Sequence, residues 1–345
     1  MAVAGPEPIT PEPITHEELQ LAARNHGMPL EALRWPLTPV GLHYLLIHYD
    51  IPMVDPATWR LHVGGLVERS LSLSLAALRE RPAITLPVTF ECAGNGRALL
   101  EPRPLSQPWL VEAVGTAEWT GTPLRGLLAE AGVAPGAVEV LFTGIDRGVE
   151  GGIEQRYERS LSLAEAMGDD VLLAWAVNGQ SLPPQHGAPL RLVVPGWYGM
   201  TNVKWLEQVT VLAEPFAGYQ QTEAYRLLDG DRPEGTVSRM LPRALLVPPG
   251  PCRLEGRAWS GSGPVTAVEV SDDGGASWAE ARLGEPVGRW AWRPWTLEWV
   301  PPGPGEYVLR CRATDATGER QPDGQPWNRK GYANNAAHRV PVTVA

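Results

Sequence analysis

The sequence predicts an α+β domain over residues 41–230, followed by an all-β sandwich over residues 235–345. Two observations lead to this fold class. The chain holds 37 glycines and 35 prolines among 345 residues, which favours many short strands and turns over a helical protein. Strand-like and helix-like segments alternate up to about residue 225, whereas from about residue 235 turn signals recur roughly every ten residues without helical periodicity.

Residues 1–40 predict an extended arm and a helix ahead of this domain. Four prolines fall in the first fifteen residues, and Thr15 and Glu18 form a capping box for a helix that ends near Gly27. Residues 42–49 follow as an apolar and aromatic run that Pro52 ends. This run fits a buried strand or an ordered loop that faces a cofactor, and the residues alone leave both open.

Within the α+β domain, short apolar or alternating runs predict strands at 59–63, 86–90, 138–143, 171–177, 190–194 and 205–212. Asn178 and Gly179 predict a tight hairpin turn. A short helix is predicted at 74–81, where Pro82 ends it. A second helix is predicted through Ala131, with Thr122 as its N-cap and Pro123 in its first turn.

In the C-terminal part, alternating segments at 253–259, 265–270, 295–299 and 307–313 lie between turns rich in Gly, Pro and Asp. This spacing is typical of an immunoglobulin-like sandwich. Cys252 and Cys311 could face each other across it, but reduced core thiols are favoured over a disulfide in a cytosolic chain.

Composition excludes several classes of function. A net charge of −10 and the absence of a basic tract argue against nucleic-acid binding. No apolar run is long enough to span a membrane. The start of the chain shows no basic n-region, apolar h-region or twin arginine, which favours a cytoplasmic location. The three cysteines form no CxxC or CxxCH, so no zinc, iron–sulfur or covalent haem motif is visible.

The strongest chemical signal is the segment 90–97, Phe-Glu-Cys-Ala-Gly-Asn-Gly-Arg. It places the Cys92 thiol at the end of a predicted strand, and Gly94 and Gly96 let the backbone turn sharply beside a ligand. Arg97 could lower the pKa of the thiol or bind an anion next to it. From the residues alone, a buried core cysteine is favoured over a reactive or metal-bound one.

The Cys-Ala-Gly-Asn-x-Arg pattern beginning at Cys92 resembles the molybdenum-ligand loop of the sulfite oxidase family. Four further segments agree with that family in the same order, at 144–146, 179–183, 186–196 and 202–206. The resemblance extends over about residues 42–344. It implies a molybdopterin-binding domain followed by an immunoglobulin-like dimerisation domain.

The resemblance also implies the cofactor, a molybdopterin whose molybdenum is bound by the Cys92 sulfur. Arg191 and Lys204 would supply cations for the cofactor phosphate, His186 a hydrogen-bond donor, and Asp146 an acceptor for the pterin amino groups. The implied cofactor-binding residues are His48, Cys92, Asp146, His186, Arg191, Asn202, Val203 and Lys204.

The implied substrate pocket departs from the family pattern at two positions. Tyr225 matches a pocket tyrosine, Arg97 is kept, and Trp109 falls near a pocket tryptophan with a spacing two residues short. His48 and Lys330 stand where sulfite-binding members carry arginine, so the charge of the pocket would vary with pH around the usual histidine pKa, about 6.5. The implied catalytic residues are therefore Cys92, Tyr225, Arg97, His48 and Lys330. A His48 packed in an aromatic cluster stays open as the alternative.

The implied activity is oxygen-atom transfer, in the first place oxidation of sulfite to sulfate. No haem motif is visible, so electrons would leave to a separate acceptor. Two alternatives stay open: reduction of nitrate or of S- and N-oxides with the same cofactor, and a non-catalytic binding module on the same fold. The family further implies a homodimer through the sandwich, whose tryptophans are Trp278, Trp290, Trp292, Trp295 and Trp299.

Overall fold

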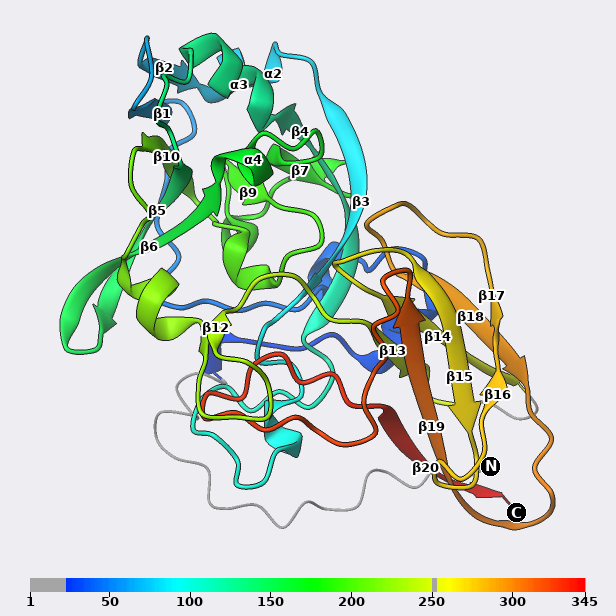
Figure 1. Cartoon of the computed structure of the whole chain (residues 1–345). Helices are drawn as coiled ribbons and strands as arrows, with labels where there is room; N and C mark the ends of the chain where they lie inside the picture. Colours follow the sequence, from blue (N-terminus) through cyan, green and yellow to red (C-terminus); the bar gives the residue numbers. More distant parts are fainter. Residues whose placement is uncertain (1–22, 250–252, 345) are drawn as a thin grey trace.

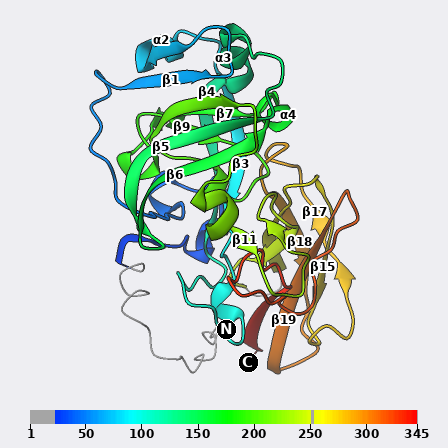
Figure 2. The ribbon, with the colours of Figure 1, turned by 60° about the vertical axis from the view of Figure 1, so that its left-hand side comes forward.

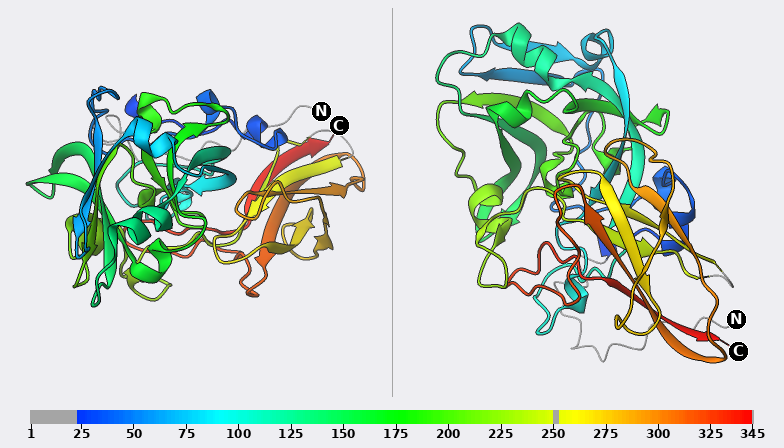
Figure 3. Two further views of the ribbon diagram at one scale, coloured as in Figure 1. Left: turned by 90° about the horizontal axis from the view of Figure 1, so that it is seen from above. Right: turned by 45° about the vertical axis from the view of Figure 1, so that its right-hand side comes forward.

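The computed structural model describes residues 23–249 and 253–344. The predicted N-terminal arm, most of the helix after it, and Cys252 lie outside the described residues. The described chain forms two regions that lie side by side, one built of two sheets with short helices and one built of strands (Figures 1 and 3). None of the described helices is long and apolar enough to cross a membrane.

Five strands form a mixed sheet in the order β2-β1-β10-β5-β6. β1 and β10 are parallel, and the other neighbouring pairs are antiparallel. The strands β5 and β6 form a long hairpin that extends away from the body of the domain (Figure 1). The bounds are β1 Arg60–Gly65, β2 Leu71–Ser74, β5 Glu139–Glu150, β6 Ile153–Ser162 and β10 Leu206–Leu212.

A second sheet has the order β3-β4-β7-β8, and β9 also pairs with β7. Its strands are β3 Ile84–Glu91, β4 Val114–Pro123, β7 Leu172–Val177, β8 Gln180–Ser181 and β9 Arg191–Val193. One buried apolar cluster holds side chains of both sheets, such as Val63 and Phe142 from the first and Val114 and Leu192 from the second. The sheets therefore share a core, and Figure 2 shows their strands from another side.

Three short α-helices lie in this region of the described chain: α2 Leu75–Arg79, α3 Leu124–Ala131 and α4 Leu163–Ala166. The predicted cap of α3 is wrong. Thr122 and Pro123 end strand β4, and the N-cap residue Pro123 makes no side-chain cap bond. The helix begins at Leu124 and ends at Ala131, and its C-cap residue Gly132 has a φ of 70°, the left-handed conformation typical of a helix end.

The run 42–49 forms a loop, which decides between the two predicted alternatives. Val40–Leu42 is a single 3-10 turn, and beyond it only Leu45 makes a bridge, to His26. Because His43 and Tyr44 are buried without belonging to a sheet, their side chains can face a cavity.

The C-terminal region consists of two antiparallel sheets, β13-β14-β18-β17 and β16-β15-β19-β20. Leu254 of one sheet and Leu309 of the other belong to one buried cluster, so the sheets pack face to face. Their strands are β13 Arg243–Leu246, β14 Arg253–Trp259, β15 Val265–Ser271, β16 Ala279–Glu280, β17 Arg282–Leu283, β18 Arg293–Glu298, β19 Gly305–Asp315 and β20 His338–Val344. The small sheet of β11 (Arg226–Leu227) and β12 (Gly235–Thr236) precedes them.

Most of the sandwich tryptophans are packed inside the chain. Trp292 and Trp295 are fully buried, and Trp299 is nearly so. Trp290 pairs with Val88 of β3 and donates its indole N–H to Asp170, so it joins the two regions. Trp292, Trp295 and Trp299 therefore do not supply an exposed dimer surface. Cys311 is a buried free thiol.

Candidate functional site

The Cys92 loop begins where β3 ends, and its own backbone closes it. The Cys92 N–H donates to the Ala113 carbonyl at 2.9 Å, and the Asn95 N–H donates to the Cys92 carbonyl at 3.0 Å. Gly94 is required sterically, because a Cβ there would lie 2.5 Å from the Arg97 guanidinium. The turn thus holds the thiol and the guanidinium close together.

The Cys92 thiol is shielded from water, with 6% of the residue exposed. Burial raises the pKa of this thiol, and the nearby Arg97 cation acts in the opposite direction. A metal ion would bind the thiolate and release the proton. The thiol faces two adjoining spaces, which we call the inner cavity and the outer cleft.

The inner cavity has an empty volume of about 610 Å³, which includes space open to solvent. It is lined by the loop 43–48, the end of β3, and segments around Asp146, His186 and Asn202. Eight of the residues that the sequence singles out line it: His48, Cys92, Asp146, His186, Arg191, Asn202, Lys204 and Tyr225. The structure therefore brings together segments that lie up to 177 residues apart.

Two cations lie in the wall of the inner cavity, the buried Arg191 and the half-buried Lys204. Arg191 donates to the carbonyls of His186 and Asn202 at 3.0 and 3.1 Å. Lys204 donates to the Leu46 carbonyl at 2.7 Å. Neither forms an ion pair with a carboxylate among the described residues. Two cations held in this way create a binding site for an anionic group.

Burial disfavours charge on the titratable groups of this wall. It lowers the pKa of Lys204 to about 7, with the Arg191 cation acting in the same direction, and it raises the pKa of Asp146 to about 6. It also lowers the pKa of His186 to about 2 and that of His43 to about 4. The two imidazoles are therefore neutral near pH 7 and can each donate and accept a hydrogen bond.

Several buried polar atoms here have no hydrogen-bond partner in the described part of the chain. They include Nε of Arg191, Oδ1 of Asp146 and Nε2 of His43. Buried polar groups in proteins are nearly always hydrogen-bonded, so these atoms indicate a polar ligand or ordered water. Donors, an acceptor and two cations together fit a cofactor that carries a phosphate and a nitrogen-rich ring.

The outer cleft adjoins the inner cavity, and both are lined by Cys92. Cys92, Arg97, Trp109 and Tyr225 line it together with His48. Arg97 is buried: its Nε donates to the Lys330 carbonyl at 3.0 Å and its Nη1 to the Gln107 carbonyl at 2.9 Å. This places one cation and one tyrosine beside the thiol, where a small anion could reach all three groups.

His48 belongs to an aromatic cluster. Its ring centroid lies 4.6 Å from that of Tyr157, and its Nε2 is hydrogen-bonded to the Tyr225 hydroxyl. Burial, with Lys204 and Arg24 nearby, lowers the pKa of His48 to about 3. A neutral ring is therefore favoured at this half-buried position, and the expected dependence on pH around the usual histidine pKa of about 6.5 is shifted to lower pH.

Two of the expected site residues line neither space. Val203 is fully buried in the apolar core of the domain, although its neighbour Asn202 lines the inner cavity. Lys330 donates from its ammonium group to the carbonyls of Glu223 and Ala224 and is not among the residues that line the outer cleft.

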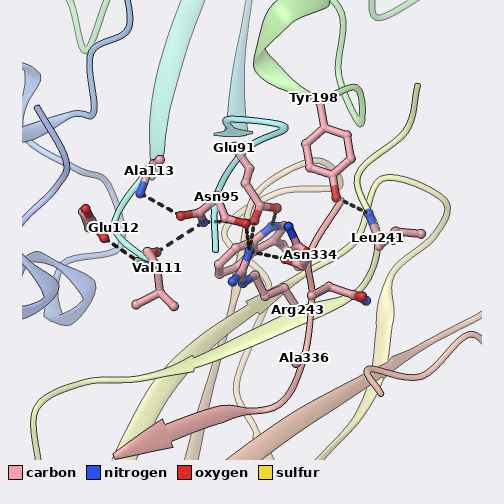
Figure 4. A network of polar contacts seen from close by, with 12 residues as sticks. Glu91, Asn95, Val111, Glu112, Ala113, Tyr198, Leu241, Arg243, Asn334 and Ala336 are labelled. Carbon is pink, nitrogen blue, oxygen red and sulfur yellow. Dashed lines mark hydrogen bonds and ion pairs between the residues drawn. The ribbon is translucent and has the colours of Figure 1, made fainter. Parts of the chain in front are cut away.

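A buried polar network supports the Cys92 loop from behind (Figure 4). The Glu91 carboxylate accepts from Arg243 Nη1 at 2.5 Å, from the Trp259 indole at 2.9 Å and from Asn95 Nδ2 at 3.0 Å. Arg243 also donates to the Asn334 carbonyl at 2.9 Å. Because Arg243, Trp259 and Asn334 belong to the C-terminal region, that region helps to shape the loop that carries the thiol.

Sequence reasoning did not single out several residues of the site. His43, Tyr44, Tyr157 and Met200 line the inner cavity, and Arg24 lines the outer cleft. His43 and Tyr44 lie in the run 42–49, for which the sequence left a cofactor-facing loop as one of two alternatives. That alternative was the signal that could have identified them. The others carry no local signal, because folding alone brings them to the site.

Comparisons with known proteins agree with this geometry. Residues 48–220 match the model of the oxidoreductase molybdopterin-binding domain, and residues 243–345 match that of the Mo-co oxidoreductase dimerisation domain. The chain is 36% identical to mitochondrial sulfite oxidase of Mus musculus, covering 99% of this chain and 69% of that protein. It is 38% identical to sulfite oxidase of Gallus gallus, covering 96% and 80%.

Two further relatives are informative. The chain is 33% identical to NADH nitrate reductase of Solanum lycopersicum over 89% of its own length, which is 38% of that protein. The structure is similar to sulfane dehydrogenase SoxCD from Paracoccus pantotrophus, with a TM-score of 0.82, 28% identity, and coverage of 99% of this chain and 90% of that one. Two domain models match the chain, and sulfite oxidases match it over nearly its whole length. The chain therefore belongs to the sulfite oxidase family of Mo-molybdopterin oxidoreductases.

Proposed function

We propose that this enzyme oxidises sulfite to sulfate. The observation that carries the proposal is the outer cleft, which Arg97 and Tyr225 line together with Cys92. An oxyanion can accept hydrogen bonds from both groups while its central atom faces the metal position. Similarity to sulfite oxidases over nearly the whole chain supports the same substrate class.

The reaction balances with water as the source of oxygen. Sulfite and water give sulfate, two protons and two electrons. The molybdenum cofactor supplies the oxygen-atom transfer and takes up the two electrons. The electrons then leave to a separate acceptor.

In this proposal the inner cavity holds the cofactor. Cys92 supplies the thiolate ligand, and Arg191 and Lys204 hold the phosphate. Asp146 accepts from the pterin amino groups, and His186, Asn202 and the backbone near Val203 complete the wall. His48 lies at the junction of the two spaces, where its neutral ring orients the Tyr225 hydroxyl.

The role of the outer cleft is to bind and orient the oxyanion. Arg97 is fixed by two backbone carbonyls, so its guanidinium is held in one orientation before the substrate arrives. The apolar faces of Trp109 and Tyr332 border the same space and exclude water from it.

Reduction of nitrate or of an S- or N-oxide is the second candidate, and the state of His48 favours it. A neutral His48 and a Lys330 that does not line the cleft leave less positive charge than a pocket with three arginines, so a less charged substrate also fits. Similarity to nitrate reductase is consistent with this reaction.

We further propose a homodimer formed through the C-terminal region, supported by the match to the Mo-co dimerisation domain. Light scattering that shows a monomer at micromolar concentration would contradict it. A cytoplasmic location is also proposed, on the ground that three cysteines in 345 residues form no disulfide framework. Cell fractionation tests it.

A steady-state assay tests the proposed activity. Molybdenum-loaded protein is given sulfite with an artificial electron acceptor and, in parallel, nitrate or a sulfoxide with reduced viologen. We expect sulfite-dependent reduction of the acceptor to have the higher kcat/KM. Faster turnover of nitrate or of the sulfoxide would replace the proposal by the second candidate.

A further inference from the structure

The turn that carries Tyr225 is a short π-helix, Gln220–Ala224, which ends directly before the tyrosine. Single π-helical turns are often found at functional sites. The last carbonyl groups of a helix have no partner inside it, so other groups must satisfy them. In this turn, cationic side chains do so from two sides.

Arg159 of β6 holds the first carbonyl of the turn. It is fully buried, and its Nη1 donates to the Gln220 carbonyl at 2.5 Å. Its guanidinium lies 5.8 Å from the centroid of the Tyr225 ring. Within residues 23–249 and 253–344 it forms no ion pair with a carboxylate. The positive charge thus stays beside the tyrosine.

Lys330 holds the other end of the turn. Its ammonium group donates to the Glu223 carbonyl and, at 3.2 Å, to the Ala224 carbonyl. The backbone carbonyl of Lys330 accepts from Arg97 Nε at 3.0 Å. Lys330 is therefore linked to both residues that face the oxyanion. Its carbonyl is hydrogen-bonded to Arg97, and its ammonium group is hydrogen-bonded to the two peptide groups that precede Tyr225.

We infer that Lys330 is a positioning residue, which fixes the turn before Tyr225 and acts on the oxyanion through the Tyr225 hydroxyl without contacting it. The alternative is direct contact, as expected for an arginine at this position of the family pattern. The inference rests on the proposed function, because it assumes that the outer cleft binds an oxyanion.

A double-mutant cycle separates the two roles. Sulfate binding to the full-length, molybdenum-loaded protein is measured by calorimetry for the wild type, Lys330→Met, Tyr225→Phe and the double variant. Methionine keeps the length of the side chain and removes the donors. Arg329→Met is the matched control, because Arg329 is 62% exposed and pairs with Asp229.

We expect Lys330→Met to weaken sulfate binding about tenfold in the wild type and less than about twofold in the Tyr225→Phe background. Arg329→Met should change the dissociation constant by less than about twofold. Equal losses in the two backgrounds, or no loss in either, would overturn the inference.

Lys330→Arg gives a second, conservative test. A guanidinium can donate to both carbonyls, so binding should stay within about threefold of the wild type. A gain of about tenfold or more would indicate direct contact and overturn the inference. Because sulfate binding needs no turnover, a protein that binds sulfate but does not oxidise sulfite contradicts the proposed function alone.

Discussion

The inner cavity and the outer cleft share the Cys92 thiol, but their polar groups are satisfied in different ways. In the inner cavity, buried atoms of Arg191, Asp146 and His43 have no partner among the described residues. In the outer cleft, His48 is bonded to Tyr225, and Arg97 is bonded to backbone carbonyls. The buried Nε1 of Trp109 and Oε1 of Gln220 in that cleft have no partner among the same residues. The unpartnered groups of the inner cavity are therefore ionisable ones, whereas those of the outer cleft are an indole N–H and an amide oxygen.

This difference explains why the cofactor is easier to assign than the substrate. Unpartnered buried groups specify what must bind them, because leaving such a group unsatisfied costs about 1–3 kcal/mol each. A cleft whose groups already bond one another constrains its ligand only through the donors that stay available. The cofactor and the enzyme class are shown by the family, and the substrate remains a proposal.

The largest expected effect comes from the residue that both spaces share. Cys92→Ser should lower sulfite turnover by more than about a hundredfold with the fold intact, because a hydroxyl cannot replace a soft thiolate ligand. Turnover per bound molybdenum is compared with that of the control Cys311→Ser, because Cys311 lies in the buried cluster of the C-terminal region. A Cys92→Ser protein with near wild-type turnover would remove the link between the two spaces.

The buried polar network of Glu91 and Arg243, which supports the Cys92 loop, gives the next effect. Arg243→Met leaves the Glu91 carboxylate buried without its cation, so the free energy of unfolding should fall by about 3–5 kcal/mol. Urea unfolding measures this. Adding Glu91→Gln removes the unpaired charge and should restore part of the loss. A fall of less than about 1 kcal/mol for Arg243→Met would contradict the role assigned to the network.

The inner cavity alone is tested through its cations. Arg191→Met and Lys204→Met should each lower the molybdenum content of purified protein about tenfold, since a charged hydrogen bond to phosphate is lost. Arg289→Met serves as the control, because Arg289 is largely exposed. Equal molybdenum content in the three variants would mean that the inner cavity does not hold the phosphate.

The smallest effect concerns protons at the junction of the spaces. Folding lowers the pKa of His48 to about 3, so the unfolded chain binds the proton more readily than the folded one below about pH 6.5. Stability of the metal-free protein should therefore fall as pH drops from 6.5 towards 3, and His48→Gln should make that fall shallower. In the molybdenum-loaded form, KM should change with pH between 6 and 8 in parallel for the wild type and His48→Gln. A steeper fall for His48→Gln would contradict this.

Much of the fold could be predicted from local patterns. The short apolar runs that became β3 and β7 and the turn signals of the C-terminal region were sufficient to place them. Strands β4 and β6 were missed, because one is rich in Gly and Thr and the other is highly charged, so neither shows an apolar alternation. Their strand conformation comes from pairing with neighbours.

The site divides in the same way. Residues in motifs, such as Cys92 and Arg191, could be named from the sequence because the family pattern contains them. The contacts of Lys330 and of the Glu91–Arg243 pair could not, since their partners lie 107 and 152 residues away. A burial-dependent pKa such as that of His48 also requires the fold, because it depends on which neighbours exclude water.

X-ray absorption at the molybdenum edge tests the central claim, that the Cys92 sulfur binds the metal where the two spaces meet. The molybdenum-loaded wild type is compared with Cys92→Ser, with Cys311→Ser as a control. We predict one sulfur neighbour fewer around molybdenum in Cys92→Ser and an unchanged number in the control. The same number of sulfur neighbours in wild type and Cys92→Ser would contradict the account.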